Sequence, residues 1–239
     1  MRQWPFALFV VASLLAAGCG SGPEREETES AEAAEANARL GLAYLEQGDH
    51  QRARSKLERA LRFDPDHAEA HHYLAELYRR LGEPERAREH YAAALDAAPE
   101  DPALNNNVGV FRCDQGEVEA AVEAFETAAA DPVYERRTEA LANAGQCLRE
   151  AERFDEAAEY YRRALDRDDH PDRLLREMAE LRMEQGEHLS ARGFLERYLD
   201  RVDEPGEEAL ELGIRIERAL DNPAGARRYR RQLEEGGHG

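Results

Sequence analysis

The chain has 239 residues and a formal net charge of −19, so it is long enough for one large domain or a repeat array, and it is strongly acidic. Because phosphate backbones would be repelled by this charge, we expect no nucleic-acid partner. Only 7% of the residues are aromatic, and Ala, Leu, Glu and Arg are abundant. This composition favours helices over strands and predicts an all-α protein.

The N-terminal segment has the pattern of a secretory signal. An uncharged stretch covers residues 4–17, which is shorter than the ~20 residues that span a bilayer. It ends in Leu15-Ala16-Ala17-Gly18-Cys19, which resembles the lipobox of bacterial lipoproteins. The resemblance implies removal of residues 1–18 and lipidation of Cys19. Since Gly20 is not Asp, it also implies an outer-membrane anchor facing the periplasm. The alternatives are an ordinary signal peptide or a free thiol.

An acidic segment follows the cysteine. Residues 20–36 contain six Glu together with Gly, Ser and Pro, and no large apolar residue. Such a composition cannot bury enough surface to offset the entropy of ordering. We therefore expect residues 19–33 to form a flexible acidic tether that carries the lipid.

From residue 34 the sequence repeats at an interval of 34 residues. Small residues such as Gly41 and Ala75 recur where two helices must cross closely, and large ones such as Leu57 and Tyr91 recur where the seam between them must be filled. Gly48 and Gly82 recur where a first helix would end in a left-handed conformation.

This pattern resembles the tetratricopeptide repeat, a helical hairpin that stacks on its neighbours. We predict a superhelix of six hairpins over residues 34–235, with repeats starting near 34, 68, 102, 138, 172 and 206, and a short tail at 236–239. The spacing slips by two residues at 131–137, and Glu152 stands where Gly is usual.

No catalytic motif is present: there is no nucleophile elbow, phosphate-binding loop, zinc-protease motif or dinucleotide turn. We therefore expect no enzyme, no cofactor and no small-molecule substrate. His67, Glu69, His71 and His72 form the best candidate metal cluster, because His67 and His71 share a helix face. Since His71 falls at a packing position, the interpretation we favour is a packed or solvated cluster with no metal.

Cys113 and Cys147 fall at nearly equivalent places in the first helices of the third and fourth repeats. These helices are neighbours in a stack, and an envelope compartment would be oxidising. We predict a disulfide between them. The alternative is a pair of buried free thiols.

Amide side chains gather on the same two helices. Asn105, Asn106, Asn107, Asn143 and Gln146 lie on or near the expected concave side, and His72 should face the groove from the second repeat. Because amides donate and accept hydrogen bonds, Asn106, Asn107, Asn143, Gln146 and His72 are predicted to bind a partner's backbone. Capping and hydrogen bonding between helices is the competing explanation.

The combined features resemble one family, the lipoproteins of type IV pilus biogenesis and stability, also called pilotins. The matching segments are A-H-H-Y-L-A-E-L-Y-R-R-L-G-E at 70–83, N-N-V-G-V-F-R-C-D-Q-G at 106–116, D-P-V-Y-E-R-R at 131–137 and N-A-G-Q-C at 143–147. The resemblance implies binding of the outer-membrane secretin and promotion of its localisation and assembly. The alternative function is that of another periplasm-facing repeat lipoprotein, an adaptor for peptidoglycan enzymes, which would not need the central motifs.

Overall fold

The computed structural model describes residues 23–236, which form helices joined by short turns, with no strand in that range. The helices are α1 (Pro23–Glu46), α2 (His50–Phe63), α3 (Ala68–Arg80), α4 (Pro84–Ala97), α5 (Pro102–Asp114), α6 (Val118–Ala130), α7 (Arg137–Glu150), α8 (Phe154–Leu165), α9 (Arg173–Glu184), α10 (His188–Leu199), α11 (Glu207–Ala219) and α12 (Pro223–Gly236). The predicted signal peptide at 1–18, Cys19 and residues 237–239 lie outside the described range.

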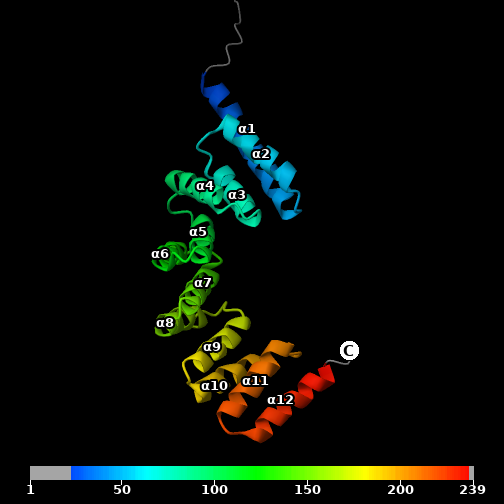
Figure 1. Ribbon diagram of the computed structural model, residues 1–239. Helices are drawn as coiled ribbons and strands as arrows, with labels where there is room; N and C mark the ends of the chain where they lie inside the picture. Colours follow the sequence, from blue (N-terminus) through cyan, green and yellow to red (C-terminus); the bar gives the residue numbers. More distant parts are fainter. Residues whose placement is uncertain (1–22, 237–239) are drawn as a thin grey trace, which may run out of the picture.

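Consecutive helices pair as six hairpins, and each hairpin packs on the next. Figure 1 shows the hairpins following a curved path from α1 to α12, with α4, α6 and α8 along its outer side. The prediction of an all-α superhelix of about six hairpins is confirmed. The first helices of units two to six begin at Ala68, Pro102, Arg137, Arg173 and Glu207.

The acidic segment differs from the expected flexible tether. Helix α1 begins at Pro23, so the part of residues 19–33 that the structure describes is helical. Ser30 Oγ donates to Phe63 O at 2.8 Å, which ties this extension to the end of α2. The physical reason is that Glu and Ala are strong helix formers, and this stretch continues directly into a helix held by buried Ala34 and Ala38.

Each hairpin is closed by a small residue facing a large one. A Cβ atom added at Gly109 would lie 2.6 Å from the Phe125 ring, and one at Gly145 would lie 2.6 Å from the Tyr161 ring. Phe125 and Tyr161 are fully buried. The glycines therefore allow the two helices to approach until the ring fills the seam, as the repeat pattern predicts.

The turns within the hairpins all carry a left-handed residue. It is glycine at Gly48, Gly82, Gly116 and Gly186, with φ between 71° and 76°. In units four and six the same conformation is held by Glu152 (φ 60°) and Asp221 (φ 53°). A residue with a Cβ pays about 1–2 kcal/mol to adopt this conformation, so these two turns are strained.

We expect Glu152→Gly to raise the free energy of unfolding by about 0.5–1 kcal/mol, because relief of the left-handed strain exceeds the extra entropy of glycine in the unfolded chain. Urea denaturation followed by circular dichroism measures the change. Gly116→Ala is the matched control and should lower stability by about 1 kcal/mol, since its Cβ would meet nothing within 4 Å and only the backbone conformation opposes it. A loss of stability in Glu152→Gly would contradict the argument.

The junction between the third and fourth hairpins combines the slipped spacing with a covalent link. Asp131 accepts from the Val133 backbone N–H at 2.8 Å, and Arg137 Nε donates to Ala129 O at 2.9 Å, so the longer turn is held at both ends. Cys113 on α5 and Cys147 on α7 form a disulfide with a Cα–Cα distance of 5.7 Å. The longer turn thus leaves the two first helices close enough to be bridged.

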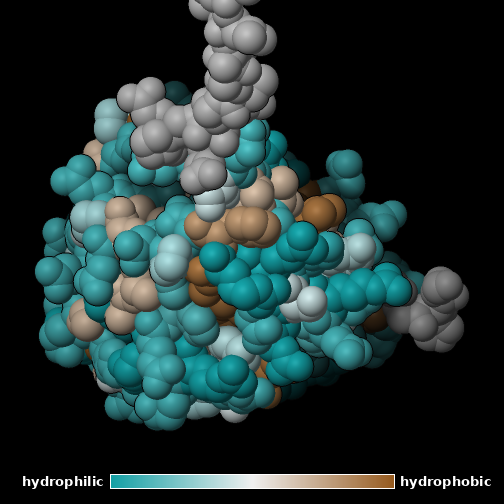
Figure 2. Space-filling model, turned by 90° about the horizontal axis from the view of Figure 1, so that it is seen from above, coloured by the Kyte–Doolittle hydropathy of each residue, from teal (hydrophilic) through white to brown (hydrophobic). Residues whose placement is uncertain are grey.

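The face of the molecule at its N-terminal end is hydrophilic over most of its area (Figure 2). Figure 2, which looks along the stack from the N-terminal end, shows apolar side chains only in small groups. Ion pairs join neighbouring hairpins, such as Arg88 with Glu117 at 2.8 Å and Arg153 with Glu119 at 2.8 Å. Within residues 23–236, none of the helices is both long enough and apolar enough to cross a membrane.

Candidate partner-binding surface

The predicted groove residue His72 is buried and bonds to the neighbouring hairpin. Its side chain on α3 accepts a hydrogen bond at Nε2 from Asn107 Nδ2 on α5, at 2.8 Å. The residue is 9% exposed, and burial lowers the pKa of its imidazole. His72 is therefore a neutral acceptor between two helices rather than a solvent-exposed side chain, and its direct contact with a partner stays a prediction.

The central asparagines also bond to one another. Asn143 Nδ2 on α7 donates to Asn106 Oδ1 on α5 at 3.1 Å, and Asn106 is 2% exposed. Asn105 donates to Pro99 O and Asp101 O at the start of α5. Together with the His72–Asn107 pair, these bonds join the first helices of units two, three and four. This is the competing explanation given above, and direct partner contact by Asn106, Asn107 or Asn143 stays a prediction.

Gln146 is the one predicted binding residue that is exposed. Its Nε2 donates to Glu150 Oε1 at 2.9 Å, one turn further along α7. Both side chains face solvent next to the disulfide-linked Cys147. The accessible part of the predicted site therefore lies at the C-terminal end of α7 rather than at its start.

The histidine cluster is divided between separate contacts. His71 Nε2 donates to Pro65 O at 2.9 Å, so in the neutral pair its Nδ1 accepts from His90 Nδ1 on α4, also at 2.9 Å. The His90 ring stacks on Tyr78 with a centroid distance of 5.5 Å. His71 thus packs between helices, as its repeat position predicts, and makes other contacts than His67 does.

Burial, together with His71 and Arg86 nearby, lowers the pKa of His90 to about 4. Between about pH 6.5 and 4 the unfolded chain binds a proton here that the folded chain does not. This contribution to stability is fully present above pH 6.5 and is lost as the pH falls through this window. Between pH 7 and pH 4.5 we expect the wild-type protein to lose about 1–2 kcal/mol more unfolding free energy than His90→Gln does. This figure is lower than the full pKa shift would give, because the ring is half-exposed and solvent screens it. Urea titrations at pH 7 and pH 4.5 measure it, and identical pH slopes in both proteins would contradict it.

The remaining pair, His67 and Glu69, meets a residue that the sequence did not single out. Glu35 on α1 lies 3.4 Å from His67 Nε2, and one potential ligand atom from each of Glu35, His67 and Glu69 falls within 4.8 Å of the others. His67 Nδ1 accepts from the Ala70 backbone N–H and caps α3. Burial and the Glu35 carboxylate raise the pKa of Glu69. Because His67 already caps a helix, the geometry describes a contact between α1 and α3 rather than a prepared metal site.

Further along the stack, arginines connect the first helices of units four to six. Arg149 on α7 contacts Glu184 at 2.6 Å and Glu180 at 3.0 Å, both on α9. Arg176 on α9 contacts Glu180 at 2.5 Å and Glu208 at the start of α11 at 3.2 Å. Hydrogen bonds to these carboxylates hold the guanidinium groups in place, so this face is polar and preorganised.

A row of three surface hollows runs along the turns of units four to six; we call it the turn-edge row. Their volumes are about 470, 410 and 450 Å³. The first is lined by Gln146, Arg149, Glu150, Glu152, Phe154 and Glu184, the second by Glu152, Arg153, Phe154, Asp155, Glu156, Gln185 and Glu187, and the third by Gly186, Glu187, His188, Leu189, Ser190 and Leu220. Shared lining residues show that adjacent hollows meet.

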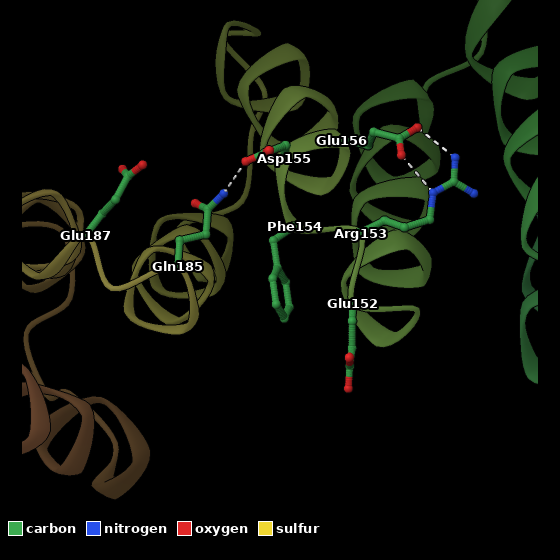
Figure 3. A pocket seen from close by; sticks show the side chains of 7 residues that line it. All are labelled: Glu152, Arg153, Phe154, Asp155, Glu156, Gln185 and Glu187. Atoms are coloured by element: carbon green, nitrogen blue, oxygen red, sulfur yellow. Dashed lines mark hydrogen bonds and ion pairs between the residues drawn. The ribbon is translucent and has the colours of Figure 1, made fainter.

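Figure 3 shows how the middle hollow is built. The half-buried Phe154 ring points into the space between the two turns, with Glu152 on one side and Gln185 on the other. Gln185 Nε2 donates to Asp155 at 2.9 Å across the hollow, whereas Arg153 turns aside to pair with Glu156 at 2.7 Å. The hollow thus presents an aromatic ring among carboxylates, and its arginine, Arg153, is already paired with Glu156.

The sequence points to two residues of this row. Gln146 is a predicted binding residue, and Glu152 is an exception to the glycine rule. The other lining residues come from helix ends and turns of successive units and become neighbours only when the units stack.

The comparisons with known proteins agree with this architecture. A tetratricopeptide repeat family model matches residues 44–106 and 148–212, and a second model of the same repeat matches residues 112–172. The structure of MamA, 19% identical with a TM-score of 0.61, shares the fold alone.

Two pilus proteins match over most of their length. The type IV pilus assembly protein PilF of Pseudomonas aeruginosa is 28% identical over 206 residues, which cover 85% of this chain and 80% of PilF. The solved structure of that PilF gives a TM-score of 0.74 at 29% identity, covering 87% of this chain and 93% of the other. PilW, described as a widely conserved type IV pilus biogenesis factor, gives 0.75 at 29% identity, with coverage of 84% and 92%.

The resemblance to type IV pilus biogenesis proteins that carry tetratricopeptide repeats is therefore confirmed in both sequence and fold. More than half of the chain is matched by the repeat models themselves. The chain belongs to the tetratricopeptide repeat family.

Proposed function

We propose that this protein acts in type IV pilus biogenesis as a lipid-anchored binding scaffold. It holds the secretin subunit at the outer membrane, on the periplasmic side, and promotes secretin localisation and assembly. No chemical reaction is required of it, because a stack of helical hairpins offers an extended, preorganised surface that acts by binding.

The observation that carries this proposal is similarity over nearly the whole chain to a named pilus assembly protein and to a pilus biogenesis factor. The matches cover 93% and 92% of the two solved chains, so they include the whole stack of hairpins rather than a few generic repeats. The secretin as client and the outer membrane as address come from the family resemblance and from the Cys19 motif.

The position of α1 fits a membrane anchor. Helix α1 begins at Pro23, only a few residues after Cys19. At about 3.6 Å per residue, the two residues can lie at most roughly 14 Å apart. A lipid on Cys19 would therefore hold the N-terminal hairpin close to the bilayer. The later hairpins would extend away from it along the curved stack seen in Figure 1.

Deletion of the gene in the source organism tests the function. We expect loss of surface pili, and a secretin that is unassembled or displaced from the outer-membrane fraction. Affinity capture of the purified protein from detergent-solubilised envelopes should recover secretin. Intact pili with normally assembled secretin, or capture without secretin, would overturn the proposal.

Two single variants test membrane anchoring and outer-membrane localisation separately. Cys19→Ala removes the acylation site and should release the protein from membranes. Gly20→Asp keeps the cysteine but resembles an inner-membrane retention signal, so the protein should stay membrane-bound and move to the inner-membrane fraction. Outer-membrane localisation of Cys19→Ala would contradict the anchor.

A further inference from the structure

The turn-edge row has a chemical character that sets it apart from the rest of the acidic surface. Its first two hollows hold three carboxylates, on Glu150, Glu152 and Asp155, that form no ion pair within the described residues. Glu150 and Asp155 accept hydrogen bonds from the neutral amides of Gln146 and Gln185, and the disulfide-bonded Cys113 Sγ lies 3.9 Å from Glu150 Oε2. We infer that the turn-edge row is a docking site for an extended, arginine-containing segment of a partner protein, with one arginine seated on Phe154.

The first argument is the match between arginine and the middle hollow. A guanidinium group can lie flat on an aromatic ring while its N–H groups donate to carboxylates at the edge of that ring. Phe154 offers the ring, Glu152 lies to one side of it, and Asp155 lines the same hollow near the backbone of Phe154 (Figure 3). Arg153 does not occupy this place, because it pairs with Glu156 and Glu119. Similar contacts occur within this chain, where Arg86 lies 3.8 Å from the centroid of the Tyr78 ring.

The second argument is the apolar end of the row. Leu189, at the start of α10, is 66% exposed and lines the third hollow together with Leu220 from the end of α11. A large exposed leucine at the edge of a hollow is a place where an apolar side chain would remove surface from water. The occupant therefore carries an apolar residue as well as a basic one.

The local structure at Glu152 is consistent with this use. Glu152 holds a left-handed conformation that glycine would hold at lower cost, and its side chain lines both of the hollows beside Phe154. A glycine at this position would relieve strain but would remove the carboxylate that both hollows share. Stability and binding are thus expected to change in opposite directions at this residue.

Charge decides the occupant. Six carboxylates and two guanidinium groups line the first two hollows, in a chain whose net charge is −19, so an acidic partner would be repelled. A second copy of this chain could offer the exposed arginines Arg227, Arg230 and Arg231 of α12. We favour a separate partner, because two copies of so acidic a chain repel each other overall.

The test uses purified protein and a short fluorescein-labelled peptide that alternates arginine with leucine. Glu152→Gln/Asp155→Asn should weaken binding about tenfold, measured by fluorescence anisotropy at physiological salt. The control Glu89→Gln/Glu123→Gln removes the same charge from exposed positions on α4 and α6 and should weaken binding less than about twofold. Phe154→Leu should weaken binding of the arginine peptide about fivefold. It should also reduce the ratio of this affinity to that for a peptide with lysine in place of arginine.

Three outcomes would overturn the inference. The first is equal weakening by the two charge variants, which would mean that the peptide binds the acidic surface at large. The second is unchanged binding by Phe154→Leu in a protein that retains its helicity. The third is a dimer of the protein alone that the peptide dissociates, since that would make the second copy the occupant. No secretin is used, so failure of secretin capture and failure of this docking site are separate results.

Discussion

Replacing both bridged cysteines, as Cys113→Ala/Cys147→Ala, should lower the free energy of unfolding by about 3–4 kcal/mol. The bridge closes a loop with a sequence separation of 34 residues, and the chain-entropy account of disulfides gives this magnitude for a loop of that length. Alanine is the suitable replacement because Cys147 is 1% exposed and a hydroxyl there would be buried without a partner. Urea denaturation without reductant measures the loss.

The wild-type protein supplies the control. Added reductant should shift its unfolding curve to that of the double variant and leave the variant unchanged. Because hairpins contact only their neighbours, loss of the bridge should also weaken the coupling of units one to three with units four to six. The midpoints of the two halves should then separate in hydrogen exchange. Superimposable curves for oxidised and reduced wild-type protein would contradict the prediction.

The second large effect concerns the fourth hairpin, where Gly145 faces Tyr161. Tyr161→Leu should destabilise by about 2–4 kcal/mol, because it leaves unfilled the space of a fully buried ring. Gly145→Ala should destabilise by about 1–2 kcal/mol: its Cβ would lie 2.6 Å from the ring, and the better helix propensity of alanine offsets part of the clash.

Combining the two changes should cost less than their sum by about 1–2 kcal/mol, because the new methyl group occupies part of the space that the ring leaves. The fifth hairpin already uses this pairing, with Ala179 and Leu195 both fully buried at the equivalent positions. Gly193→Ala is the matched control: it lies in α10 with nothing within 4 Å of the added Cβ, and it should stabilise by about 0.5–1 kcal/mol. Strict additivity of Gly145→Ala and Tyr161→Leu would contradict the packing argument.

The sequence predicted those features that depend on one hairpin at a time. The spacing of small and large residues, such as Gly109 with Phe125, specifies how two helices cross, and that crossing repeats regardless of the rest of the stack. The Cys113–Cys147 pairing could be anticipated for a related reason, since repeat register alone places the two cysteines on neighbouring helices.

Features that depend on how hairpins sit against one another were not predicted. The burial of His72 follows from the approach of Asn107 on the next unit, and the Glu35–His67 contact follows from a helix that extends beyond the repeat. That extension was not predicted, because low apolar content is typical of disorder, although the same Glu and Ala residues favour a helix when it is already nucleated.

The disulfide has one more consequence, which is mechanical. If the chain is pulled from its two ends, tension passes from Cys113 directly to Cys147, and α6, the following turn and most of α7 carry no load. At roughly 3.3 Å per residue, the sequence separation of 34 corresponds to about 110 Å of contour length. The oxidised chain cannot extend by this length. The oxidised protein should therefore extend as two separate arms about an inextensible centre, and reduction should add the missing length in a single-molecule pulling trace.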